Sequence, residues 1–162
     1  IWFEEVVPNG ARFIVKLPAL IQPGMSVPAA SPQTADLRRA LIIDDEPDVA
    51  GSLADVLELM GIKSHLVSAW VSASESLGES EPDIVFSDLR MPGKSGLAIY
   101  RELIEGRPAL ARRFVLVTGD MIGARAEIEA LAPHLRPQVL EKPFSTLDVR
   151  GVLAAIQDRY QG

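Results

Sequence analysis

The sequence predicts an α/β fold in which a five-stranded parallel sheet is covered by helices on both faces. From residue 38 onward, short apolar runs alternate five times with segments whose apolar residues recur at helical spacing. This alternation is typical of parallel strands joined by crossover helices. One run, residues 84–86, leads through Ser87 to Asp88 and then to a Pro92-Gly93 turn, as expected of a strand buried on both faces. Because crossovers are right-handed, all five strands would end on one edge of the sheet, where such folds bind their ligands.

The expected boundaries follow from apolar runs, helix caps and breakers. Pro47 fits a first helical turn, and Gly61, Gly78 and Gly106 with Pro108 mark helix ends. Ser145 and Asp148 form a capping box before the last helix. The polar interruptions of the second strand indicate an edge position. We expect strands at 40–43, 63–67, 84–87, 114–117 and 139–140, and helices at 47–60, 70–77, 97–104, 122–131 and 146–160.

Composition limits the class of protein. The chain has 162 residues, of which 48% are hydrophobic and 23% charged, which suits one soluble domain plus an extra segment. The formal net charge of -6 disfavours a nucleic-acid partner, because phosphate backbones require a basic patch. The absence of cysteine excludes a disulfide framework and is compatible with a reducing, cytoplasmic location. No apolar run approaches the length of a membrane span, so we expect no membrane contact by this segment.

The first part of the chain is expected to lie outside the sheet. Residues 1–20 predict a β-hairpin turning at Asn9-Gly10, which is a strong short turn signal. Residues 21–37 are rich in proline and alanine and predict an extended linker. The α/β domain would then occupy residues 38–162.

The side chains at the predicted strand ends indicate phosphoryl chemistry. Asp44 and Asp45 follow the first strand, Asp88 the third, Thr118 the fourth and Lys142 the fifth. Crowded carboxylates require a cation, and Mg²⁺ prefers such oxygen ligands. A metal, an ammonium and a hydroxyl are what the oxygens of a transferring phosphoryl group need. Asp88 is left as the nucleophile that would form an acyl phosphate, although an isolated aspartate at this place could also serve as a cap or turn former.

Residues 38–161 resemble the receiver domain of bacterial response regulators. The resemblance is carried by four motifs, which are Asp44-Asp45-Glu46, Asp88 with Met91-Pro92-Gly93 and Gly96, Thr118-Gly119, and Lys142-Pro143-Phe144. It implies a flavodoxin-like (βα)5 three-layer sandwich with strand order 2-1-3-4-5. It also implies that Asp88 accepts a phosphoryl group from a histidine of a kinase.

The resemblance assigns a ligand set to Mg²⁺. Asp45 and Asp88 would bind the ion directly, the backbone carbonyl of Arg90 would add a ligand, and Asp44 would assist. All four positions follow predicted strands that should be neighbours in the sheet.

The same resemblance assigns Thr118 and Lys142 to the phosphoryl oxygens. It further implies a cis peptide bond between Lys142 and Pro143, which is an uncommon arrangement even for X-Pro bonds. One position departs from the family, since receivers usually carry an aromatic residue three positions before the lysine and this chain has Val139. The aromatic–threonine coupling of the family therefore cannot operate unchanged.

The N-terminal segment carries a second resemblance. Ile1-Trp2-Phe3-Glu4, Gly10-Ala11-Arg12-Phe13 and Leu17-Pro18 resemble the closing hairpin of a histidine kinase ATP-binding domain. A remnant of that hairpin at residues 1–20, followed by a linker and a receiver, is the layout of a hybrid sensor histidine kinase. An arbitrary hairpin extension is the alternative. The chain has no Gly-rich ATP-binding loop, so it would catalyse only its own phosphorylation and dephosphorylation.

Three functional classes are consistent with these residues. The first is a phosphorelay receiver that takes its phosphoryl group from a kinase phosphohistidine, in cis, and passes it to a histidine phosphotransfer protein. The second is a response regulator, either single-domain or coupled to DNA, and the chain end at Gly162 without an effector domain disfavours a DNA-binding output. The third is an aspartate-nucleophile phosphatase, which places an acid/base aspartate where Arg90 stands. His65 and His134 are expected to be structural or solvated and not phosphodonors.

Overall fold

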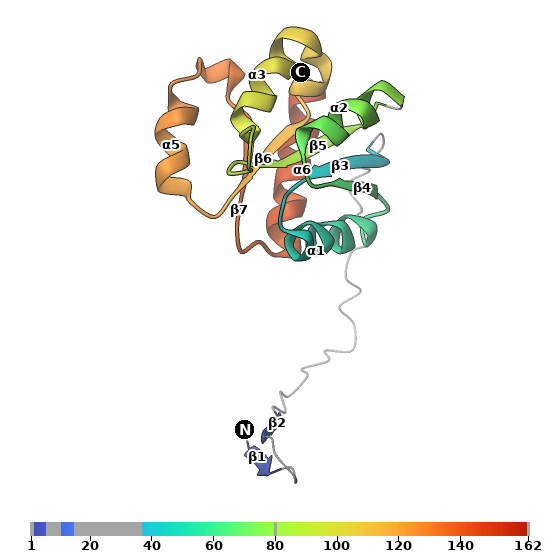
Figure 1. Ribbon diagram of the computed structural model, residues 1–162, viewed down its shortest axis with the longest axis vertical. Helices are drawn as coiled ribbons and strands as arrows, with labels where there is room; N and C mark the ends of the chain where they lie inside the picture. Colours follow the sequence, from blue (N-terminus) through green and yellow to red (C-terminus); the bar gives the residue numbers. More distant parts are fainter. Residues whose placement is uncertain (1, 6–10, 15–36, 80, 162) are drawn as a thin grey trace. The chain divides into compact units, whose positions relative to one another are not determined.

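The computed structural model describes residues 2–5, 11–14, 37–79 and 81–161 (Figure 1). The chain divides into two compact units, Ile1–Ser31 and Pro32–Gly162. The first unit contains strands β1 (Trp2–Glu5) and β2 (Ala11–Ile14), which pair antiparallel with Phe3 opposite Phe13. The predicted hairpin pairing is therefore present. The predicted Asn9-Gly10 turn and nearly all of the linker lie outside the described residues, so the domain boundaries stay a prediction.

The second unit is built on a five-stranded parallel sheet. Its order is β4-β3-β5-β6-β7, which confirms the predicted order 2-1-3-4-5. Every residue of β5 and β6 is buried, whereas β4 at the edge has three exposed residues, as its polar interruptions indicated. The strands are β3 (Arg39–Ile43), β4 (Lys63–Val67), β5 (Ile84–Asp88), β6 (Phe114–Thr118) and β7 (Gln138–Glu141).

Five helices correspond to the predicted ones, and two short helical segments were not predicted. The five are α1 (Pro47–Glu58), α2 (Trp70–Glu79), α3 (Gly96–Gly106), α5 (Met121–Glu129) and α6 (Thr146–Gln161). The additional segments are α4 (Pro108–Ala111) and the 3₁₀ turn η1 (Pro133–Leu135). Both start at a proline, Pro108 or Pro133, because proline is suited to the first turn of a helix as well as to the break after one. Gly78 does not end α2, which continues to Glu79, since glycine is tolerated in a last turn.

Two hydrophobic cores lie on the two faces of the sheet, as the alternation of side chains along each strand requires. Ile42 and Phe86 face the core formed with α1 and α6, whereas Leu41, Ile43 and Val85 face the core formed with α2, α3, α4 and α5. Helices therefore cover both faces, in the predicted three-layer arrangement (Figure 1).

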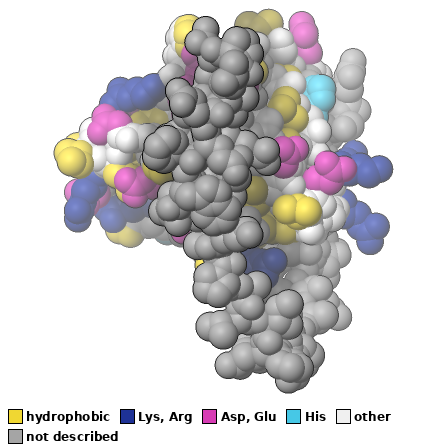
Figure 2. Space-filling model, turned by 90° about the horizontal axis from the view of Figure 1, so that it is seen from below, with side chains coloured by type: hydrophobic (Ala, Val, Ile, Leu, Met, Phe, Trp, Pro, Cys, Tyr) yellow, Lys and Arg dark blue, Asp and Glu magenta, His cyan; other side chains and the backbone are white. Residues whose placement is uncertain are grey.

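Charged side chains of both signs are visible on the surface. In Figure 2 the described Lys and Arg side chains lie among Asp, Glu and hydrophobic side chains. Among the described residues, none of the helices combines the length and apolar character that crossing a membrane requires.

Candidate functional site

The predicted site residues meet at the carboxyl edge of the sheet. Asp88 is the last residue of β5 and Thr118 the last residue of β6, while Asp44 directly follows β3. All three side chains are among the few buried polar ones, with relative exposures of 6%, 1% and 5%, respectively. Lys142 follows β7, and its backbone N–H extends the ladder by donating to the Thr118 carbonyl at 2.8 Å. The parallel topology thus brings together residues that lie almost one hundred positions apart.

Lys142 links the two buried carboxylates. Its Nζ lies 2.7 Å from Asp88 Oδ1, 2.9 Å from Asp44 Oδ2 and 3.3 Å from Glu46 Oε1. The peptide bond between Lys142 and Pro143 is cis, as predicted. The contact with Glu46 was not predicted, although Glu46 belongs to the same acidic run as Asp44. The ammonium thus contacts three carboxylates. Asp44 and Glu46 follow β3, and Asp88 ends the neighbouring strand β5.

Burial and charge shift the protonation equilibria at this centre. Burial lowers the pKa of Lys142, but the hydrogen bonds and charges of Asp88 and Asp44 outweigh it and raise the pKa above the ordinary lysine value. For Asp44, burial first and the charge of Asp88 second raise the pKa, and together they outweigh the lowering by the Glu46 N–H and by Lys142. Lys142 therefore stays protonated at neutral pH. A further cation would stabilise the negative charge of the acidic side chains around it.

The turn after β5 holds Asp88 in place. The Arg90 backbone N–H donates to Asp88 Oδ2 at 2.6 Å, and the Gly96 N–H donates to the Leu89 carbonyl at 3.1 Å. A Cβ at position 96 would overlap the backbone oxygen of Asp88 and lie 2.9 Å from Leu116 Cδ1. Only glycine fits there, which gives the physical reason for Gly96 in the motif. Gly93, with a φ of 81°, occupies the left-handed conformation that the turn requires.

Thr118 presents a buried hydroxyl on the strand next to Asp88. Its Oγ1 accepts a hydrogen bond from the Asp120 backbone N–H at 3.0 Å. The Thr118 oxygen therefore accepts a hydrogen bond within the turn, and the hydroxyl O–H can act as a donor to another group. Asp88 pairs with Val117 in the ladder, so Thr118 is one position further along the neighbouring strand.

Two of the predicted metal ligands, Asp44 and Asp88, are buried beside Lys142. Asp44 and Asp88 share Lys142, whereas the Asp45 side chain is exposed. Within the described residues, no group of three or more His, Cys, Asp or Glu side chains could hold a metal ion. Lys142 forms an ion pair with each of the two buried carboxylates. The donor set of carboxylates and a backbone carbonyl nevertheless has the hard oxygen chemistry that suits Mg²⁺, and the site stays a prediction.

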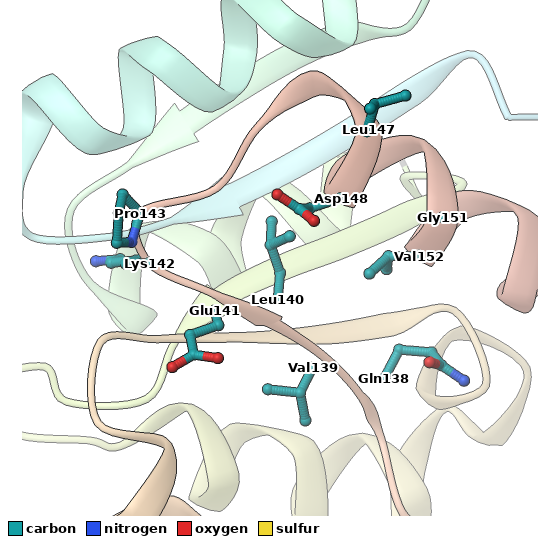
Figure 3. A pocket seen from close by; sticks show the side chains of 10 residues that line it. All are labelled: Gln138, Val139, Leu140, Glu141, Lys142, Pro143, Leu147, Asp148, Gly151 and Val152. Atoms are coloured by element: carbon teal, nitrogen blue, oxygen red, sulfur yellow. The ribbon is translucent and has the colours of Figure 1, made fainter.

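Val139 lies on a groove formed by β7 and the start of α6. Figure 3 shows this groove, which is lined by Val139, Lys142, Pro143 and Leu147, among others. The Val139 side chain is partly buried and packs against the core that contains α5. Because valine is short and stiff at χ1, it cannot alternate between exposed and buried positions as an aromatic ring can.

Arg90 makes contacts that sequence reasoning missed. Its guanidinium Nη2 lies 3.8 Å from Asp120 Oδ2 and 3.7 Å from Glu127 Oε1, both belonging to the start or body of α5. Nothing in the local sequence indicates this pair, since the partners lie thirty or more residues further along the chain.

A buried aspartate at a strand end, paired with a lysine and adjacent to a threonine, on a 2-1-3-4-5 sheet, defines a receiver-type domain. Comparison with known families agrees, since the model of the response regulator receiver domain matches residues 40–153. The chain therefore belongs to the response regulator receiver family, as the sequence motifs predicted. This places it in two-component signalling.

Relatives occur in both regulators and kinases. The transcriptional regulatory protein DctD of Rhizobium meliloti is 41% identical over 81 residues, covering 48% of this chain and 16% of DctD. The sensor histidine kinase AtsR of Burkholderia thailandensis is 29% identical over 105 residues, covering 62% of this chain and 17% of AtsR. A solved sensor protein from Polaromonas sp. JS666 has 25% identity and a TM-score of 0.66, covering 75% of this chain and 97% of that one. The chain thus spans less than a fifth of these two curated relatives.

Proposed function

We propose that this chain is the phosphoacceptor module of a phosphorelay, in which Asp88 takes a phosphoryl group from a kinase phosphohistidine and passes it to a histidine phosphotransfer protein. The observation that supports this most directly is the Lys142 ammonium 2.7 Å from Asp88 and 2.9 Å from Asp44 at the carboxyl edge of the sheet. That arrangement places the buried Asp88 carboxyl group next to the positive charge of Lys142.

The geometry suggests how the chain's own residues act. A carboxylate oxygen of Asp88 attacks the phosphorus of the phosphohistidine, so that an O–P bond forms while the N–P bond breaks and the electron pair returns to the imidazole. The positive charge of Lys142 stabilises the negative charge that develops on the phosphoryl oxygens. Thr118 donates its hydroxyl proton to one of them. Onward transfer is the same displacement by a histidine of the partner.

The metal assignment completes this proposal. Receiver domains bind Mg²⁺ in the active site. In this chain Asp45 and Asp88, with the Arg90 carbonyl and the assistance of Asp44, would hold the ion. Bound Mg²⁺ would supply further positive charge to the phosphoryl oxygens.

The source of the phosphoryl group is inferred from the N-terminal unit and one relative. The hairpin of β1 and β2 resembles the end of a kinase ATP-binding domain, and AtsR is a sensor histidine kinase. Together they support a kinase that donates in cis within a hybrid protein. We further propose that the receiver acts in the cytoplasm. The likeness to DctD, a transcriptional regulatory protein, favours the second candidate, a response regulator.

A two-stage phosphotransfer assay tests the proposal. The full chain is first incubated with Mg²⁺ and a phosphorylated histidine kinase, and then with a panel of histidine phosphotransfer domains. We expect label to reach this chain and then to move to the histidine of one phosphotransfer domain, with EDTA blocking the first step. If the label leaves the chain only as inorganic phosphate, the response-regulator candidate is favoured over the relay.

A further inference from the structure

Arg90 connects the phosphoacceptor turn to helix α5. Its backbone N–H donates to Asp88 Oδ2 at 2.6 Å. Its guanidinium meanwhile lies 3.8 Å from Asp120 Oδ2 and 3.7 Å from Glu127 Oε1. A single residue therefore contacts the acceptor carboxylate through its main chain and α5 through its side chain.

The first turn of α5 leaves space for this guanidinium. Asp120 caps the helix, with its Oδ1 accepting from the Gly123 N–H at 2.8 Å. A Cβ at position 123 would overlap the Asp120 carboxylate and lie 3.2 Å from Arg90 Nη2. A larger side chain there would displace both charged groups. Glycine at position 123 therefore leaves room for Arg90 to pair with Asp120 beside the first turn of α5.

The ion pair is weak enough to be exchanged. Both distances exceed hydrogen-bond length, and the three side chains are 59%, 56% and 45% exposed. Exposed pairs of this kind contribute little, because water screens them. A phosphoryl group on Asp88 would carry about two negative charges in place of the single charge of a carboxylate, and the planar guanidinium is well matched to phosphate oxygens. The stronger acceptor would thus compete for Arg90 with the two carboxylates of α5.

We propose that Arg90 is a second cation for the phosphoryl group, and that it exchanges Asp120 and Glu127 for the phosphoryl oxygens when Asp88 is phosphorylated. The inference rests on the proposed function, because it requires a phosphoryl group on Asp88. The exchange leaves two carboxylates on α5 without their partner, so the phosphorylation state of Asp88 reaches α5. Linkage then requires that weakening the Arg90–α5 pair strengthens phosphoryl binding by the same factor.

The test uses the full chain, with beryllofluoride and Mg²⁺ as the phosphoryl probe and titration calorimetry as the readout. Glu127→Gln removes one α5 partner of Arg90. Glu129→Gln is the matched control, since it removes the same charge from the same helix but pairs with Arg125 at 2.7 Å. We expect Glu127→Gln to bind the probe about two- to five-fold more tightly than wild type, the factor that an exposed ion pair supplies. Glu129→Gln should bind as wild type does.

A second readout follows the helix itself. Amide hydrogen exchange of residues 121–129 should rise when the probe binds to wild type, and should rise less in Glu127→Gln. Equal probe affinities for the two glutamine variants would overturn the inference alone. If beryllofluoride does not bind any variant and acetyl phosphate does not label the chain, the proposed function fails and the inference fails with it.

Discussion

The close approach of Gly96 to Asp88 predicts a large effect of one added methyl group. In Gly96→Ala the new Cβ would overlap the Asp88 backbone oxygen and lie 3.0 Å from the Asp88 carbonyl carbon and 2.9 Å from Leu116 Cδ1. Backbone atoms of the central strand β5 cannot rotate away, so the start of α3 and the end of β5 must separate. Overpacking of this kind costs about 1–3 kcal/mol. The helical preference of alanine over glycine offsets at most about 1 kcal/mol.

A matched glycine separates sterics from helix propensity. Gly51 lies within α1, and a Cβ there has nothing within 4 Å. Gly51→Ala should therefore raise the free energy of unfolding by about 0.5–1 kcal/mol, whereas Gly96→Ala should lower it by about 1–2 kcal/mol. Urea unfolding monitored by circular dichroism measures both values, and the m-values should agree with wild type. Equal stability of the two variants would refute the claim that Gly96 is fixed by its contact with Asp88.

Three further predictions follow. Lys142→Met leaves two buried carboxylates without their cation and should lower the free energy of unfolding by about 3–5 kcal/mol at pH 7. Because the pKa of Lys142 is raised in the folded state, the difference from wild type in urea unfolding should be full up to pH 10.5 and shrink above it. The Ser145 hydroxyl and N–H lower the pKa of Asp148, so its stabilising contribution is present above pH 3.8 and lost on further acidification, and Asp148→Asn should abolish that part of the acid dependence. Deletion of residues 1–30 should leave folding and phosphorylation intact, and loss of either would show that the hairpin is needed by the receiver.

The sequence was most informative where the role of a residue follows from its neighbours within the same strand. The run into Asp88 predicted both a central strand and a ligand-binding edge, because burial on two faces and a carboxylate at the end can be read locally. The short helix at Pro108 and the 3₁₀ turn at Pro133 were missed, since proline is compatible with both a break and a helix start. The pairing of Arg90 with Asp120 and Glu127 joins the turn after β5 to the segment of α5, which no local pattern encodes. Asp44 and Asp88 both contact Lys142 Nζ, at 2.9 and 2.7 Å, whereas the Asp45 side chain is exposed, and the shared metal site stays a prediction.

The central claim is that Asp88 is the residue that becomes phosphorylated. The most direct measurement incubates the full chain with acetyl phosphate and Mg²⁺, reduces the product with borohydride, and locates the modified residue by tandem mass spectrometry. Asp88→Asn serves as the matched variant, because it keeps the size of the side chain and removes the nucleophile. We predict conversion at residue 88 in wild type, none in Asp88→Asn, and none without Mg²⁺. Modification of a different residue, or equal labelling of Asp88→Asn, would contradict the account.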